Sequence, residues 1–144
     1  MGRLSWLDST LGIDETVTDG FAPVEITQKD DAGMSVKVGG CNKVVDVSSE
    51  GMVQQITVEN NKTRNGQRRT TQTPTLASPV EFVLFDLGGK PVPLTVVSPL
   101  AVTKHTAATA QWTTQLSGGG VTVEVNGVSD LDVCPLFMVI SSMV

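Results

Sequence analysis

The sequence predicts an all-β fold, a β-sandwich or jelly-roll of roughly eight strands with a short N-terminal helix or extended arm. The composition is 40% hydrophobic and only 17% charged, and it is rich in Val and Thr, which favour pleated strands. Short stretches of alternating apolar and polar residues recur along the chain, separated by Gly and Pro. The length of 144 residues is typical of one domain. We expect residues 1–22 to form the arm and residues 23–144 the sandwich domain.

The N-terminal arm has a pattern of its own. Leu4, Leu7 and Leu11 recur with helical spacing, and Trp6 adds a further apolar side chain. A helix of about nine residues is too short to be stable alone in water. We therefore expect these four residues to dock, either on the chain's own domain or on a partner.

Alternation predicts the strands of the first half of the domain, which cover residues 24–27, 34–38, 43–47 and 52–59. The following segment, residues 60–78, has almost no apolar content and carries Asn65-Gly66 near its middle. It is either a long polar loop or a polar hairpin that closes on the Asn-Gly pair, which is a strong turn signal.

The second half of the domain is more apolar. Pro91 and Pro93 lack the amide donor that an interior strand needs, so the strand that contains them is expected at an edge or with a bulge. Turns are expected at Gly118–Gly120 and at Asn126-Gly127. The predicted strands cover 80–87, 91–97, 110–116, 121–125 and 133–140. The expected core positions are Phe82, Leu84, Val92, Leu94, Val123, Val125, Phe137 and Val139.

Residues suited to catalysis are scarce. His105 is the only histidine, and a general base also needs a nucleophile and an orienting partner. Cys41 and Cys134 form either one disulfide or two buried thiols, and the absence of a visible secretion signal favours the thiols. The aspartates do not make a full ligand set for a cation. We expect no catalytic, cofactor-binding or metal-binding residue, no enzymatic activity and no transmembrane segment.

One segment concentrates positive charge. Lys62, Arg64, Arg68 and Arg69 lie within eight positions, whereas the rest of the chain has six basic and fifteen acidic residues. The segment either contacts nucleic-acid phosphates, meets an acidic neighbour such as a second copy, or is a solvated charge cluster. Nucleic acid is not favoured, because the segment has no aromatic side chain for base stacking and the chain has a net charge of -5.

Two stretches resemble a known class of protein. VQQITVENN, followed by a polar insertion and PVEFVLFDLGG, resembles small β-sandwich structural proteins of tailless icosahedral bacteriophages. The C-terminal CPLFMVISSMV similarly looks like the closing strand of single jelly-roll vertex or minor capsid proteins. The resemblance implies a capsid, vertex or decoration protein located in the virion, with other copies of itself and other capsid proteins as partners.

The sequence is also consistent with a second function, that of a carbohydrate- or surface-binding β-sandwich module. Such a module often stacks sugars on exposed aromatic side chains, and the chain has two Trp, four Phe and no Tyr. Trp112 is the aromatic residue best placed for such a site, but we expect it to pack in the core instead.

Overall fold

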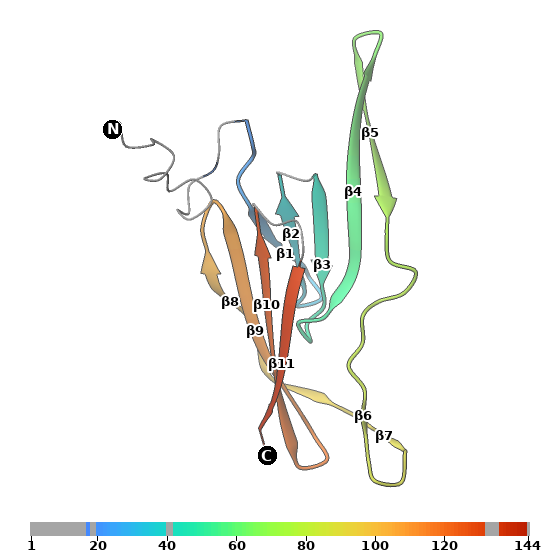
Figure 1. Cartoon of the computed structure of the whole chain (residues 1–144), viewed down its shortest axis with the longest axis vertical. Coiled ribbons are helices and arrows are strands. Elements are labelled where there is room, and N and C mark those ends of the chain that lie inside the picture. The colour runs from blue at the N-terminus through green and yellow to red at the C-terminus, as the bar shows by residue number, and fades with distance from the viewer. Residues whose placement is uncertain (1–16, 18–19, 40–41, 132–135, 144) are drawn as a thin grey trace, which may run out of the picture.

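The computed structural model describes residues 17, 20–39 and 42–131, together with the backbone of residues 136–143. Within this part of the chain the fold is all-β, with eleven strands and no helix (Figure 1). The predicted fold class is therefore confirmed. The helix or arm was expected over residues 1–22, and residues 1–16, 18 and 19 of it lie outside the described residues, so the domain boundary stays a prediction.

The strands form three antiparallel sheets. The first contains β1 (Glu25–Gln28), β2 (Met34–Val38), β3 (Lys43–Val47), β4 (Val53–Arg64) and β5 (Gln67–Pro74). The second contains β8 (Thr95–His105), β9 (Thr109–Gly118), β10 (Val121–Asp130) and β11 (Leu136–Met143). A small third sheet pairs β6 (Leu84–Phe85) with β7 (Pro91–Val92).

Neighbouring strands in each sheet are also neighbours in sequence. A jelly-roll would instead pair strands that are distant in sequence, because it is built from two Greek keys. Of the two predicted architectures, the sheets described here therefore match the sandwich.

The core lies between the two larger sheets. Alternate residues of β2 and β3, together with Val53 at the start of β4, contribute one side, and alternate residues of β9 contribute the other. Their fully buried side chains include Met34, Val36, Val47, Val53 and Trp112. This alternation is what a strand with one face on the core requires.

Gly127 lies within a strand, which corrects the turn expected at Asn126-Gly127. It is paired with Trp112 across β9 and β10. A Cβ atom at Gly127 would lie only 2.1 Å from the Trp112 ring, so glycine is needed here to let the indole lie against the backbone. The turn expected at Gly118–Gly120 is confirmed, since Gly119 and Gly120 have φ angles of 60° and 78° and join β9 to β10.

The connection between the two larger sheets differs from the prediction. Only Leu84–Phe85 of the expected strand over 80–87 is a strand, and the stretch over 91–97 divides between β7 and β8. The chain crosses from one larger sheet to the other here. It therefore has no neighbouring strand with which to form a continuous ladder of backbone hydrogen bonds. The Asp86 carboxylate instead accepts hydrogen bonds from the Gly88 and Lys90 amides and closes a turn.

The predicted core list is only partly right. Val123 and Val125 are fully buried. Phe82 and Leu94 are partly buried and pack against the same cluster as these two valines. Leu84 and Val92 are also only partly buried, because β6 and β7 form the small sheet rather than a layer of the sandwich. The side chains of Phe137 and Val139 lie outside the described residues.

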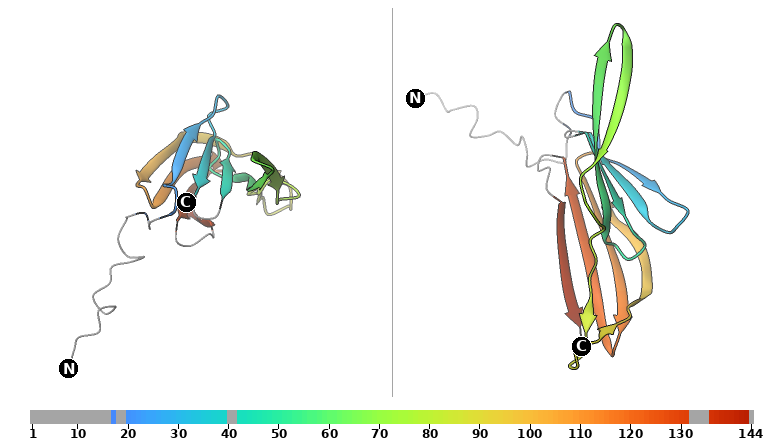
Figure 2. Two further views of the ribbon diagram at one scale, coloured as in Figure 1. Left: turned by 90° about the horizontal axis from the view of Figure 1, so that it is seen from above. Right: turned by 90° about the vertical axis from the view of Figure 1, so that its right-hand side faces the viewer.

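The polar segment over 60–78 contains a hairpin and not a long loop, so the second of the two expectations is confirmed. β4 and β5 pair from Thr57↔Pro74 to Arg64↔Gln67, and Asn65 and Gly66 have φ angles of 53° and 76°. Two positive φ angles are the signature of the type I′ turn that Asn-Gly favours. Figures 1 and 2 show this hairpin projecting well beyond the sandwich.

Candidate functional site

The turn between β3 and β4 is held in place from the core. The Ser48 amide donates to the Met52 carbonyl at 2.8 Å, and the Gly51 amide donates to the Ser48 carbonyl at 2.9 Å. The indole Nε1 of Trp112 donates to the Gly51 carbonyl at 3.2 Å. Gly51 itself has a φ of 77°, a conformation in which a side chain would be strained. The turn is therefore fixed by a buried aromatic residue of the opposite sheet.

A cavity of about 260 Å³ lies beside this turn. Its second wall comes from the segment that follows β5, which is anchored to β4 because the Val80 amide donates to the Val53 carbonyl at 2.8 Å. The lining residues are Ser48, Ser49, Glu50, Met52, Gln54, Pro79, Val80 and Glu81.

The cavity combines polar groups with a small apolar surface. The cavity is lined by the carboxylates of Glu50 and Glu81 and by the exposed side chain of Gln54. Met52, which is buried, adds an apolar part to the lining. The Ser48 hydroxyl is buried and has no hydrogen-bond partner, although buried polar groups are usually satisfied. These groups suit a small, hydroxyl-rich ligand, whose hydroxyls donate to carboxylates and accept from hydroxyl and amide groups.

Sequence reasoning missed this cavity. Ser48 to Gly51 is recognisable as a turn between two strands, and the alternation of β4 places Gln54 on its outer face. No signal in the sequence shows that residues 79–81 return to the same place, because that depends on how the chain crosses between the sheets.

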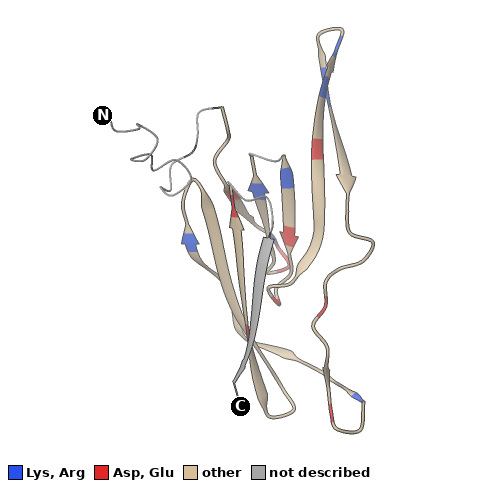
Figure 3. Ribbon diagram, viewed as in Figure 1, with Lys and Arg blue, Asp and Glu red and all other residues tan. Residues whose placement is uncertain are grey.

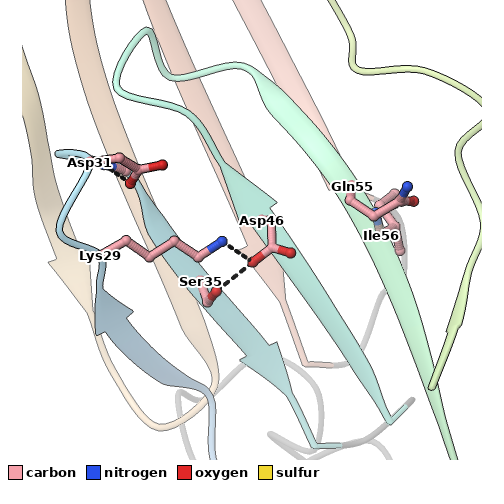
Figure 4. A network of polar contacts seen from close by, with 7 residues as sticks. Lys29, Asp31, Ser35, Asp46, Gln55 and Ile56 are labelled. Carbon is pink, nitrogen blue, oxygen red and sulfur yellow. Dashed lines mark hydrogen bonds and ion pairs between the residues drawn. The ribbon is translucent and has the colours of Figure 1, made fainter. Parts of the chain in front are cut away.

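Two carboxylates away from the cavity, those of Asp46 and Glu59, are engaged in ion pairs. Lys29 Nζ lies 2.7 Å from Asp46 Oδ1, and Ser35 Oγ donates to the same oxygen (Figure 4). Partial burial acts to raise the pKa of Asp46, but the hydrogen bonds from Lys29 and Ser35 outweigh it, so the pKa is lowered. The network links Lys29, which follows β1, to β2 and β3, so it stabilises the first sheet.

Glu59 also forms an ion pair and also has a lowered pKa. Its pKa is lowered by the hydrogen bonds from Lys37 and Gln72, and Lys37 Nζ lies 3.1 Å from Glu59 Oε2. The pair ties β2 to the base of the β4–β5 hairpin, across the intervening β3.

The basic residues predicted from the sequence are brought together at the far end of the hairpin (Figure 3). Lys62 and Arg64 lie on β4, and Arg68 and Arg69 lie on β5. All four side chains are exposed, and among the described residues none of the four forms an ion pair.

The other predicted positions do not join a site. Leu4, Trp6, Leu7 and Leu11 lie outside the described residues, and so do Cys41 and Cys134, whose pairing stays open. His105 ends β8 with its Nε2 2.9 Å from the Val24 carbonyl, so its contact is with the backbone. Trp112 is buried, with only 1% of its surface exposed, which confirms the prediction that it packs in the core.

The described residues hold no cluster of three or more His, Cys, Asp or Glu side chains that could bind a metal ion. They also include no helix long and apolar enough to span a membrane.

Comparison with known families decides the classification. A family model described as "Glycoside hydrolase 123, third domain" matches residues 30–140, which is most of the chain. The chain belongs to the glycoside hydrolase 123 third-domain family. The match includes β2 to β10, part of β11 and the cavity beside the β3–β4 turn, whereas β1 precedes it. Neither the comparison with curated proteins nor the comparison with solved structures gave a match.

Membership of the glycoside hydrolase 123 third-domain family corrects the leading functional expectation. A capsid, vertex or decoration protein was expected, and the family match points to a carbohydrate-related role instead. Nothing in the comparisons indicates a phage capsid protein. The expected capsid partners and virion location depended on that function and stay untested. The second function considered, carbohydrate or surface binding, fits the family better.

Proposed function

We propose that this chain is a non-catalytic β-sandwich module that binds carbohydrate. The observation that carries the proposal is its match, over residues 30–140, to a third domain of glycoside hydrolases. Such a module acts on no bond itself and holds a polymer or a glycan surface.

The cavity beside the β3–β4 turn is the site that best supports this function. It offers carboxylate, amide and hydroxyl groups for hydrogen bonds with sugar hydroxyls, and its volume of about 260 Å³ suits a small unit rather than a long chain. Because Trp112 is buried, recognition here depends on hydrogen bonds rather than on stacking against its indole.

The absence of catalysis is also part of the proposal. Glycoside hydrolysis commonly needs one carboxylic acid with a raised pKa and a second carboxylate at a fixed distance from it. Glu50 and Glu81 are both exposed to solvent, so neither lies in the buried, apolar surroundings that are typical of a glycosidase general acid.

A glycan array followed by calorimetric titration of the best ligand tests the proposal. We expect the full chain to bind a defined set of glycans. We expect Glu81→Gln and Gln54→Ala each to weaken binding about two- to tenfold, since each removes a hydrogen-bonding group from the cavity. Glu25→Gln, an exposed carboxylate of β1 away from the cavity, is the matched control and should bind like the parent.

Two outcomes would contradict the proposal. An array without any bound glycan would remove the function. Release of free sugar that is lost in Glu50→Gln would show that the cavity belongs to an enzyme.

A further inference from the structure

The β4–β5 hairpin presents its charges on a defined face. Residues directly opposite each other in an antiparallel pair share a face, and Lys62 is opposite Arg69. Arg64 is two positions further along β4, so it lies on the same face. We call these three residues the basic face. Arg68, opposite Thr63, lies on the other side.

The basic face costs stability within the chain itself. Like charges that lie directly opposite each other destabilise a strand pair, and Lys62 and Arg69 are in this arrangement. No ion pair among the described residues compensates them. This cost favours a role for the charge outside the fold of the isolated chain.

The hairpin also lacks packing on either side. Every residue from 60 to 75 is exposed, and an isolated two-stranded ribbon is marginally stable in water. The type I′ turn and the cross-strand hydrogen bond from Thr70 Oγ1 to Asn61 Oδ1, at 2.8 Å, hold its register. The hairpin projects away from the sandwich (Figure 2). The exposed side chains of the basic face are therefore open to a large partner.

We infer that the basic face binds an anionic polysaccharide, one that carries sulfate or carboxylate groups. Lys62, Arg64 and Arg69 supply the charge complementarity, and Arg offers paired donors that match planar or tetrahedral oxyanions. Amide and hydroxyl side chains surround them, including Asn60, Gln67 and Thr71, and these suit the hydroxyls of a sugar chain. The choice of a polysaccharide rests on the proposed carbohydrate-binding function.

Two other partners fit the observations less well. Nucleic acid would lack an aromatic side chain on which its bases could stack, because the segment from 60 to 75 contains none. A second copy of the chain would need an acidic face. In the part of the chain that the structure describes, the exposed acidic residues are instead spread over separate elements, with Asp30 and Asp31 between β1 and β2, and Glu81 and Asp86 after β5.

Affinity electrophoresis of the full chain tests this inference. The probes are dextran sulfate, neutral dextran of the same chain length and a DNA duplex. We expect retardation by dextran sulfate at moderate salt, little by dextran, and loss of the effect as salt rises. The double variant Arg64→Gln with Arg69→Gln should bind dextran sulfate about tenfold more weakly.

The control removes the same charge from elsewhere. Lys90→Gln with Lys104→Gln, two exposed lysines outside the hairpin, should change the affinity less than about twofold. Equal losses in the two double variants, or no retardation of the parent, would overturn the inference. DNA binding as tight as dextran sulfate binding would replace the polysaccharide with a general polyanion. A dimer seen by light scattering and lost only in the hairpin variant would assign the basic face to a second copy.

The failures of the two proposals are distinguishable. Glycans bound on the array in the absence of dextran sulfate binding would overturn the basic-face inference and leave the cavity proposal standing. Dextran sulfate binding that depends on Arg64 and Arg69, without any effect of Glu81→Gln or Gln54→Ala on any glycan, would overturn the cavity proposal.

Discussion

Trp112 holds in place the β3–β4 turn that lines the cavity. Its ring lies against Gly127 on one side of the sandwich, and its indole nitrogen donates to the Gly51 carbonyl of the β3–β4 turn. A core residue of one sheet thus positions a turn of the other sheet that forms one wall of the cavity.

Gly127→Ala is expected to destabilise the fold by about 1–3 kcal/mol, because its Cβ would overlap the Trp112 ring and force the ring or the strand to shift. The free energy of unfolding from urea denaturation measures this. Thr122→Ala, a partly buried position on the same strand, should cost about 0.5 kcal/mol or less. Equal losses of unfolding free energy in the two variants would contradict the claim that the Trp112 ring requires a glycine at position 127.

Asp46 should make stability depend on pH. Its folded-state pKa is lowered, so the carboxylate contributes stability above its ordinary pKa of 3.8, and this contribution is lost as the pH falls through the folded value. We expect the difference in unfolding free energy between the parent and Asp46→Asn to be larger at pH 7 than at pH 2.5. A difference that does not change with pH would contradict the ion pair with Lys29 (Figure 4).

At the scale of elements, the hairpin and the sandwich are expected to respond separately to substitution. Gly66→Ala places a side chain at a φ of 76° with no neighbouring atom to contact, so it should weaken the turn by about 1 kcal/mol. Hydrogen exchange of the amides near the tip should quicken while the melting temperature stays within about 1 °C. Thr63→Ala, which keeps the turn, should leave exchange at the tip unchanged. A drop of several degrees in Gly66→Ala would mean that the hairpin and the core unfold as one unit.

Strand prediction succeeded where one local pattern decided the outcome. The strands Met34–Val38 and Lys43–Val47 have the expected bounds because alternation alone identifies a half-buried strand. It failed over 80–87, where the apolar run does not reveal that the chain is crossing between sheets. It also failed at Asn126-Gly127, because the ring that requires the glycine comes from a different strand.

At the scale of the whole molecule, the fold class could be predicted and the site could not. Composition and periodicity are properties of short stretches, and they were enough for an all-β sandwich. The cavity joins Glu50 to Glu81 across thirty-one positions of sequence, and only the packed structure places them together. The four basic residues were found from sequence because they lie in one short segment, but which of them share a face followed only from the hairpin register.

Amide chemical-shift mapping of the full chain with its best array ligand tests the central claim most directly. We expect perturbations to centre on residues 48–54 and 79–81, and the ligand's own signals to remain unchanged over days because no bond is cleaved. Perturbations confined to other surfaces, or new signals from a hydrolysed sugar, would contradict the claim that this chain binds carbohydrate at the cavity without acting on it.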